Sequence, residues 1–317
     1  NRDPGRRVAG RSGAGKSATR KTDEVHKVLV LDPATGTGTF LYSVIDHIRQ
    51  QFIARGDAGL WPGYVRDHLL PRLFGFELLM APYAVAHFKL SLQLAGRDLP
   101  DALRDRWAYT PEAGERLGVY LTNTLEEPHE MSGLPLFTQW VADESNAANE
   151  VKTELPVLVV MGNPPYSVSS TNKGRWIEGL MNSYKEAVRT ERNIQPLSDD
   201  YIKFIRFAQD RIERTEQGII GFITNHAYLS GLIHRGMREE LTKRFAEIYI
   251  LNLHGNTLVN STGPDGSSDN NVFDIKQGVA IALFVRGGNS IGNAPKVFYR
   301  DLWGIGKQNM LFWLQTM

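Results

Sequence analysis

The sequence predicts an α/β protein built around a mostly parallel β-sheet. Short apolar runs that end in polar or glycine-rich turns alternate with stretches whose apolar residues recur at helical spacing. The short runs are apolar throughout, which is typical of parallel strands buried on both faces. The chain has 317 residues, of which 42% are hydrophobic and 22% charged, so disordered, collagen-like and coiled-coil classes are excluded.

The first half of the chain supplies three expected strands. Val28–Leu31 is an apolar run that ends at Asp32 and is followed by a Thr/Gly-rich turn. Apolar residues then recur at helical spacing from Phe40 to Phe52, which predicts a helix. The same order repeats, with strands expected at 73–77 and 117–121 and helices at 81–94 and 136–150.

The second half continues this alternation. Pro156–Met161 is an apolar run, and the segment after it contains an amphipathic helix with Ser198 as its expected N-cap and Tyr201 and Phe204 facing inward. Further strands are expected at 218–224, 247–253 and 278–285, with a helix at 232–245 and a surface loop at 255–271.

Residues 1–27 form a basic, Gly/Arg/Ser-rich lead-in that is expected to be flexible. They carry eight Lys and Arg against three acids, and the 28 basic and 32 acidic residues that remain give the rest of the chain a net charge of −4. DNA contacts by the folded body are therefore expected to be local. Gly10–Ser17 has P-loop spacing, but neither an apolar strand nor a core helix flanks it, which favours a flexible basic segment over a nucleotide site.

The composition excludes several kinds of chemistry. The chain has no Cys, which removes disulfides, thiolate catalysis and Cys-ligated zinc and fits a reducing compartment. The eight His residues show no metal-ligand spacing. No apolar stretch is long enough to cross a bilayer, and the lead-in lacks the apolar stretch of a signal peptide. A cytoplasmic protein with no membrane partner is expected.

A glycine loop follows the first strand. Asp32 opens the sequence DPATGTGTF, in which Gly36 and Gly38 let the backbone approach a ligand and expose amides at a helix start. A dinucleotide loop needs a third glycine at position 41, which is Leu41. Glu77 ends the second strand, where an acid can accept hydrogen bonds from ribose hydroxyls. The pattern predicts a nucleoside site without phosphates, and a simple tight turn is the alternative.

The sequence NPPY follows the fourth strand. Pro164 and Pro165 stiffen the turn and remove backbone donors. The side-chain oxygen of Asn163 and the carbonyl of Pro164 can together accept both hydrogens of an NH2 group, and Tyr166 offers a flat face for stacking on a base. A rigid turn with a packed tyrosine is the alternative.

The glycine loop, the acid in LFGFELL and the NPPY sequence, in this order, resemble adenine-specific (amino) DNA methyltransferases that use S-adenosylmethionine. LTNTLEE and VFDIKQGVAIALFVR resemble the methyltransferase part of type ISP single-chain restriction–modification enzymes. The resemblance covers about Val28–Val285. It implies a Rossmann-like class I methyltransferase fold: a mostly parallel seven-stranded sheet with an antiparallel last strand and helices on both faces.

The resemblance also implies S-adenosylmethionine as the cofactor, with no metal required for methyl transfer. Asp32, Gly36 and Gly38 would line its methionine and adenosyl parts. Glu77 would bind the ribose hydroxyls, and Asn123, with its neighbour Thr124, would contact the adenine. The expected cofactor-binding set is Asp32, Pro33, Thr35, Gly36, Gly38, Phe40, Glu77, Asn123 and Thr124.

For the target, the resemblance implies an adenine flipped out of double-stranded DNA. Asn163, Pro164, Pro165 and Tyr166 form the expected catalytic set, in which the first two hold the amine and Tyr166 stacks on the base. Phe273 is a second expected aromatic contact. Accepting both N–H groups would favour a tetrahedral nitrogen and free its lone pair for attack on the methyl group.

The domain organisation that we expect has three parts. Residues 1–27 are the lead-in, residues 28–290 the methyltransferase domain with a helical insertion at 167–217, and residues 291–317 the start of a following segment. The target-recognition, helicase and nuclease segments would be missing from this chain. The whole enzyme would serve restriction–modification or phage defence.

Two other functions stay open at this point. A methyltransferase that acts on the glutamine amide of a translation factor shares NPPY, because the same two acceptors would hold that amide. A non-catalytic DNA-binding subunit could keep the fold without turnover. The 167–217 segment and the VFDIKQGVAIALFVR sequence favour DNA as the substrate, and intact Asp32, Glu77 and Asn163 argue against loss of turnover.

Overall fold

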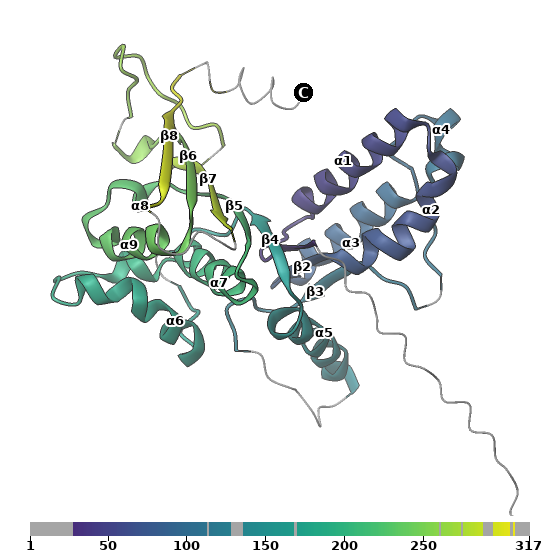
Figure 1. Cartoon of the computed structure of the whole chain (residues 1–317), viewed down its shortest axis with the longest axis horizontal. Coiled ribbons are helices and arrows are strands. Elements are labelled where there is room, and N and C mark those ends of the chain that lie inside the picture. The colour runs from purple at the N-terminus through teal and green to yellow at the C-terminus, as the bar shows by residue number, and fades with distance from the viewer. Residues whose placement is uncertain are drawn as a thin grey trace, which may run out of the picture.

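A computed structural model describes residues 28–112, 114–127, 136–167, 170–259, 261–273, 275–287, 294–304 and 307. The predictions for the lead-in at 1–27, including its P-loop-like segment, lie outside the described residues. Figure 1 shows the arrangement of the described elements.

The described residues form one mixed sheet of eight strands in the order β3-β2-β1-β4-β5-β7-β6-β8. The strands are β1 (Leu29–Asp32), β2 (Leu73–Glu77), β3 (Gly118–Leu121), β4 (Val157–Gly162), β5 (Gly218–Asn225), β6 (Glu247–His254), β7 (Val279–Arg286) and β8 (Lys296–Asp301). Only β7 runs antiparallel to its neighbours, β5 and β6. The mostly parallel α/β fold predicted from the sequence is confirmed, together with the antiparallel strand near residues 278–285.

The predicted number of seven strands is wrong, because β8 adds an eighth. It pairs in parallel with β6, from Lys296 beside Glu247 to Asp301 beside Asn252. It is also the last strand along the chain, so the antiparallel strand is the last but one. All six residues of β8 are exposed. Its apolar run, Val297 to Tyr299, has only three residues and lies between charged ones, so it is shorter than the runs that indicated the other strands.

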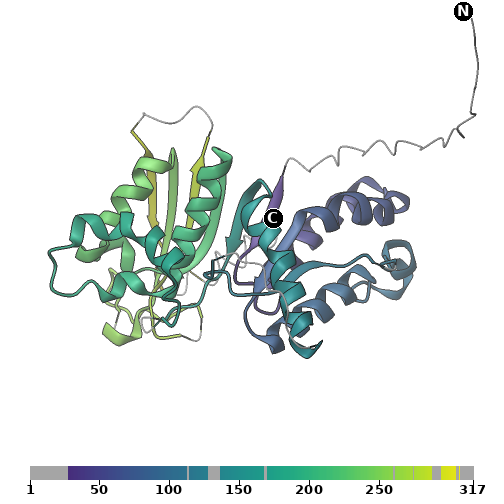
Figure 2. The same cartoon turned by 90° about the horizontal axis from the view of Figure 1, so that it is seen from below.

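Helices cover both faces of the sheet, as predicted. One face carries α1 (Thr39–Arg55), α2 (Trp61–Tyr64), α3 (Met80–Leu94) and α4 (Asp101–Trp107). The other carries α5 (Leu136–Thr153), α6 (Arg175–Lys185), α7 (Asp200–Thr215), α8 (Ala227–Ser230) and α9 (Arg235–Arg244). In Figure 2 the purple and blue helices α1–α4 lie at one end of the molecule and the green helices α6–α9 at the other.

The first helix group covers only part of its face of the sheet. Its core includes Val30, Leu73 and Val119 from the first three strands. Farther along the same sheet, Tyr249 and Leu283 are 37% and 43% exposed, and the ring of Tyr249 stacks on Phe298 at 4.7 Å between centroids. None of the described helices is long and apolar enough to cross a membrane.

The start of α7 corrects one expectation. The N-cap is Asp199 rather than Ser198, because the Asp199 carboxylate accepts a hydrogen bond from the N–H of Tyr201 at 3.4 Å. Ser198 instead ends a single 3₁₀ turn, Gln195–Ser198. The α7 helix packs on β4 and β5, with Tyr201 and Phe204 facing inward as expected.

The order of the strands places four chain segments at one edge of the sheet. Because β1 to β4 are parallel, their carboxyl ends all lie at this edge. Asp32 and Glu77 end β1 and β2, and Asn123 and Asn163 follow β3 and β4. In open α/β sheets this edge is where ligands bind.

One close approach at this edge gives a test of the packing. A Cβ atom added to Gly162, the last residue of β4, would lie 2.6 Å from the carboxylate oxygen Oδ1 of Asp32. We therefore expect Gly162→Ala to lower the free energy of unfolding by about 1–3 kcal/mol, measured by urea denaturation at neutral pH. Gly179→Ala in α6 is the matched control, since no atom lies within 4 Å of the added methyl group. An equal effect of the two substitutions would contradict the packing argument.

Candidate nucleoside and amine site

A cavity of about 450 Å³ lies at the carboxyl ends of β1 to β4. Its size is in the range of small-molecule sites. The wall is formed by Pro33, Ala34 and Gly36 after β1, by Phe76 and Glu77 of β2, by Leu78 and Leu79 after it, by Pro82 of α3, by Thr122, Asn123 and Thr124 after β3, by Asn163, Pro165, Thr171 and Asn172 after β4, and by Asp200 and Phe204 of α7. Glu77, Asn123 and Asn163, which were predicted from the sequence, are therefore brought to one site, whereas Asp32 is buried outside the wall.

Glu77 joins three chain segments at this cavity. Its Oε2 accepts a hydrogen bond from the backbone N–H of Gly36, and its Oε1 accepts one from the N–H of Leu79, both at 2.8 Å. The first contact fixes the glycine loop, and the second fixes the start of α3. Each carboxylate oxygen has about two acceptor positions, so lone pairs remain for hydroxyl groups of a ligand.

The glycine loop has the left-handed backbone that its sequence requires. Gly36 has φ of 55°, and no atom lies near the place of a Cβ, so its backbone borders the cavity directly. The N–H of Thr35 donates to the carbonyl of Phe76 at 2.9 Å, and its hydroxyl donates to the carbonyl of Asp32 at 3.0 Å. The loop is therefore held against the neighbouring strand before any ligand binds.

Two other members of the predicted cofactor set shape the loop from outside the cavity wall. Gly38, with φ of 79°, precedes α1, and a Cβ there would lie 3.3 Å from the Cβ of Ala86 in α3. Its lack of a side chain therefore serves close packing of two helices. Phe40 lies half-buried in the first turn of α1.

Asp32 lies beneath the loop and is fully buried. Its Oδ1 accepts the N–H of Ala34 at 3.1 Å, and no described residue hydrogen-bonds to its Oδ2. Burial raises the pKa of Asp32 to about 7; the Ala34 N–H opposes this shift, and the negative charge of Glu77 adds to it. The carboxyl of Asp32 thus lacks a cationic or hydrogen-bond-donating partner at Oδ2 among the described residues.

The segment after β3 is fixed in a similar way. The hydroxyl of Thr124 donates to the carbonyl of Pro33 at 2.5 Å, which ties this segment to the glycine loop. Asn123 accepts the N–H of Leu125 at Oδ1, 3.0 Å away, and its Nδ2 donates to Oδ1 of Asn172 at 2.9 Å. The side chain of Asn123 is thereby turned toward protein groups on both sides.

A buried lysine supports this segment from below. Lys152 of α5 donates to the hydroxyl of Thr122 at 3.1 Å and to the carbonyl of Asn123 at 2.7 Å. Burial lowers the pKa of Lys152 to about 8, and the charge of Glu126 opposes this shift. The cavity floor thus depends on a cation that the sequence pattern did not single out.

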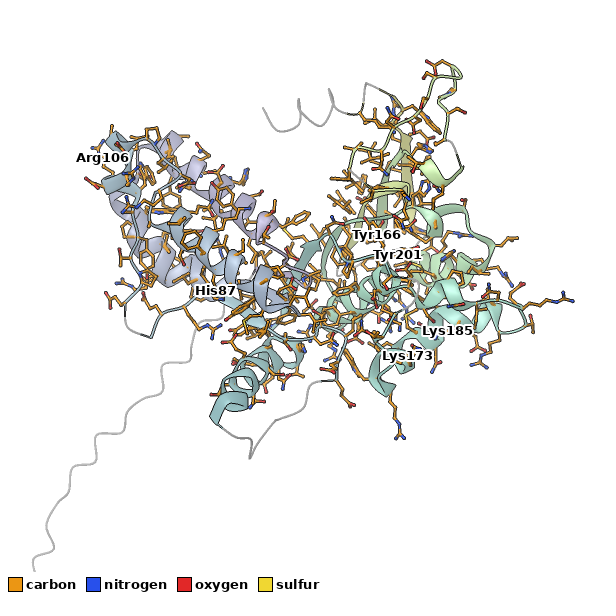
Figure 3. The ribbon with its side chains drawn as sticks, turned by 180° about the vertical axis from the view of Figure 1, so that it is seen from behind. His87, Arg106, Tyr166, Lys173, Lys185 and Tyr201 are labelled. Atoms are coloured by element: carbon orange, nitrogen blue, oxygen red, sulfur yellow. The ribbon has the colours of Figure 1, made fainter. Side chains whose placement is uncertain are left out.

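The NPPY turn closes the other end of the cavity. Asn163 and Pro165 are exposed and line the wall, whereas Pro164 is buried. The hydroxyl of Tyr166 donates to Oδ1 of Asn163 at 3.2 Å. The ring of Tyr166 meets that of Tyr201 edge to face at 5.8 Å, and Figure 3 shows the two side by side. One acceptor position of Asn163 is thus occupied by its own turn.

Phe273 lies apart from this cavity. It is half-buried in the segment 261–273, and its N–H donates to Oδ1 of Asn271 at 2.9 Å. It is absent from the cavity wall that the described residues form, so its predicted contact with a base stays a prediction. The described residues contain no group of three or more His, Asp or Glu side chains arranged to hold a metal ion.

Sequence reasoning missed several wall residues. Leu78 and Leu79 are 57% and 62% exposed, and two leucines directly after a strand-end acid are a signal that the pattern contained. Asn172 and Asp200 gave no such signal, because they reach the cavity only through the folding of residues 167–217 over the sheet edge.

Comparison with protein families shows the group to which the chain belongs. The model of the Eco57I restriction-modification methylase family matches residues 74–258. The chain is also similar to the type II methyltransferase M.BstVI of Geobacillus stearothermophilus, with 24% identity over 225 residues. This match covers 71% of the chain and 33% of the relative.

Two solved structures are similar over most of the chain. The ATP-dependent type ISP restriction-modification enzyme LlaBIII, bound to DNA, matches with a TM-score of 0.72 and 29% identity, covering 89% of this chain and 18% of that one. A DrdV–DNA complex matches with a TM-score of 0.67 and 27% identity, covering 92% of this chain and 26% of that one. The chain thus spans a third or less of the length of these three proteins.

The raised pKa of Asp32 predicts a pH dependence of stability. Its ordinary value is 3.8, so the folded state binds more protons than the unfolded state between pH 3.8 and about 7, and folding loses stability as the pH rises through this window. Asp32→Asn has no carboxyl to ionise. Relative to the parent, the variant should therefore gain unfolding free energy from pH 4 to pH 7, by at most about 1.4 kcal/mol per pH unit.

Urea denaturation of both proteins at several pH values measures this difference. Asp105→Asn, which removes an exposed carboxyl of α4, is the control and should show no such trend. If the difference in unfolding free energy between Asp32→Asn and the parent stays constant from pH 4 to pH 7, the pKa of Asp32 is not raised in the folded protein.

Proposed function

Because the chain belongs to the Eco57I restriction-modification methylase family, we propose that it transfers a methyl group from S-adenosylmethionine to the exocyclic amine of an adenine in DNA. The family assignment confirms the resemblance predicted from the sequence. The observation that carries the proposal is one cavity with Glu77 and the glycine loop on one wall and Asn163 on another.

The residues at the β1 and β2 ends fit the cofactor. Glu77 accepts two backbone N–H groups and keeps lone pairs for a ribose diol. Asp32 lies beneath the glycine loop and outside the cavity wall, and in this proposal it supports the loop that lines the methionine part of the cofactor. When bound, S-adenosylmethionine supplies a methyl group on a positively charged sulfur.

The NPPY turn fits a planar amine. Asn163 Oδ1 and the carbonyl of Pro164 accept the two N–H groups, which draws the nitrogen toward a tetrahedral geometry and frees its lone pair. The hydroxyl of Tyr166 already orients the Asn163 side chain. Chemistry of this kind depends on positioning, and it requires the adenine to leave the base stack.

We propose further that residues 28–290, together with the strand β8 that follows them, are the catalytic domain of a longer cytoplasmic enzyme. The matches cover only 33% and 18% of two of these relatives, and one of them is described as an ATP-dependent restriction–modification enzyme. Target recognition, DNA translocation and cleavage would belong to its other segments. The strand β8 at 296–301 continues the sheet of this domain.

The direct test is methyl transfer. The full-length enzyme is incubated with DNA and S-adenosylmethionine carrying a labelled methyl group, and the digested nucleosides are identified by mass spectrometry. N6-methyladenine supports the proposal. Label only in cytosine overturns the adenine specificity, and label only in a glutamine-containing protein substrate overturns DNA as the target. Binding of the cofactor without any transfer supports a non-catalytic subunit.

Cofactor binding gives a second prediction. Glu77→Ala removes the acceptor for the ribose and releases the Gly36 and Leu79 N–H groups, so affinity for S-adenosylmethionine should fall by about 10–100-fold, as expected when charged hydrogen bonds are lost. Isothermal titration calorimetry measures the change. Glu154→Ala, which removes an exposed carboxylate after α5, is the control. Unchanged affinity in Glu77→Ala would remove this residue from the site.

The role of Asn163 gives a third prediction. Asn163→Ala deletes one acceptor for the target amine, and its contact strengthens as the nitrogen becomes tetrahedral. The single-turnover rate of methyl transfer should therefore fall about a hundredfold or more. Affinity for S-adenosylmethionine should barely change, since the two prolines keep the turn. Transfer at the parental rate, or loss of cofactor binding, would leave NPPY as a structural turn only.

A further inference from the structure

The first turn of α7 holds the backbone directly after the NPPY turn. Asp199, the N-cap, accepts the N–H of Ser167 at 2.7 Å, and the N–H of Asp200 donates to the carbonyl of Ser167 at 3.3 Å. Both backbone polar groups of Ser167 are therefore bonded to one helix start, and this helix packs on β4 and β5. The backbone of Tyr166, the residue before Ser167, is thus positioned by the core of the domain.

The side chain of Tyr166 is held at two places. Its hydroxyl donates to Oδ1 of Asn163 at 3.2 Å. Its ring meets the ring of Tyr201 at 5.8 Å between centroids, with an angle of 83° between the two planes, and Figure 3 shows the pair. A ring that packs edge to face cannot turn about its own axis without losing this contact, so Tyr201 sets the plane of Tyr166.

Tyr201 is itself fixed in the core. It is 1% exposed, and its ring packs against that of Tyr228 in α8 at 6.2 Å between centroids. Because α8 follows β5, the three rings form a row from the NPPY turn to the strand beside β4. Tyr166 is only half-buried. One end of the row is therefore immobile, and the other end is a ring with surface left for a ligand.

The plane of Tyr166 matters because the same turn carries the acceptor for the amine. In the proposed reaction, a base stacks on Tyr166 while its amine donates to Asn163. Both contacts form together only when the ring plane and the Asn163 oxygen keep a fixed relation, since a tilted ring displaces the far edge of a stacked base. A displacement of about 1 Å at a reacting group can lower a rate by about a hundredfold.

We infer that Tyr201 is a positioning residue for the target base, because its ring fixes the plane of Tyr166 so that a base stacked there presents its amine to Asn163. This inference rests on the proposed methyl transfer to adenine. Tyr201 is buried and, among the described residues, does not belong to the cavity wall. It therefore acts through Tyr166 and touches neither the cofactor nor the target.

The test measures the single-turnover rate constant of the full-length enzyme, with labelled S-adenosylmethionine and a DNA that the parent enzyme methylates. Tyr201→Leu keeps an apolar side chain but removes the ring, so the rate constant should fall about 10-fold. Tyr201→Phe keeps the ring and should stay within about twofold of the parent. Affinity for S-adenosylmethionine should not change in either variant.

A matched variant separates positioning from loss of core packing. Tyr184 of α6 is also fully buried and belongs to the same core as Tyr201. Tyr184→Leu should lower the melting temperature about as much as Tyr201→Leu does, because each substitution leaves a cavity of similar origin. It should reduce only the fraction of active enzyme, seen as the amplitude of the turnover, and leave the rate constant unchanged. If Tyr201→Leu does not fold, Tyr201→Met fills more of the space and gives the same readout.

A double substitution tests whether Tyr201 acts through Tyr166. Tyr166→Ala removes the ring that Tyr201 orients, and it should slow methyl transfer by itself. When Tyr201→Leu is added to Tyr166→Ala, the rate constant should change by less than about twofold, because no ring is left to orient. Independent roles of the two tyrosines would instead make their effects multiply.

The outcomes distinguish the inference from the proposed function. A parent enzyme that transfers no methyl group to adenine overturns both. If the parent transfers methyl and Tyr201→Leu keeps its rate constant, only the role of Tyr201 is overturned. The same holds if Tyr201→Phe is as slow as Tyr201→Leu, if Tyr184→Leu is equally slow, or if the effect persists beside Tyr166→Ala. A loss that Tyr201→Phe avoids and that depends on the ring of Tyr166 supports the inference.

Discussion

The carboxylate of Glu77 is the interaction on which the site depends. It accepts one N–H from the glycine loop after β1 and one from the start of α3. A single side chain therefore connects the end of β2 to the loop after β1 and to the first turn of α3. Without it, two backbone donors at the cavity wall would have no protein acceptor. The carboxylate holds the loop at Gly36, and Thr35 holds it at Phe76 and Asp32.

The parallel sheet explains why a few residues are enough to bring several polar side chains to one edge. Four strands deliver their carboxyl ends to one edge, and each end contributes one functional group: Asp32, Glu77, Asn123 and Asn163. The residues of these strands are mostly buried, and the hydrogen bonds between neighbouring strands set the spacing between their ends. Contacts such as that between Thr124 and Pro33 then fasten the loops to one another.

Much of this arrangement could be predicted from the sequence. Asp32 and Glu77 each end an apolar run, and parallel strands place such residues at a common edge whatever the details of packing. Gly36 was predictable because only glycine adopts its backbone freely beside a ligand. Gly38 follows the same pattern, yet the structure gives it a second reason, the close approach of Ala86.

Other features depend on tertiary packing that no local pattern carries. Asp200 and Phe204 lie 37 and 41 positions after Asn163, and they reach the cavity only because α7 crosses over between β4 and β5. The strand β8 is exposed throughout, and its apolar run of three residues, Val297 to Tyr299, is shorter than the runs that indicated the other seven strands. The cap of α7 differs by one residue, since Ser198 and Asp199 are both good caps and the helix start decides between them.

The two aspartates at the start of α7 determine how the stretch after NPPY is attached to the domain. Asp199 accepts the N–H of Ser167 at 2.7 Å, and Asp200 accepts hydrogen bonds from the side chains of Ser170 and Asn172. Both sides of the stretch after NPPY are therefore hydrogen-bonded to adjacent residues at the start of one helix. Errors in position along a loop ordinarily accumulate with its length. Here Ser167 on one side, and Ser170 and Asn172 on the other, are bonded to the start of a helix that packs against β4 and β5, so one element of the core sets the position of both attachment points.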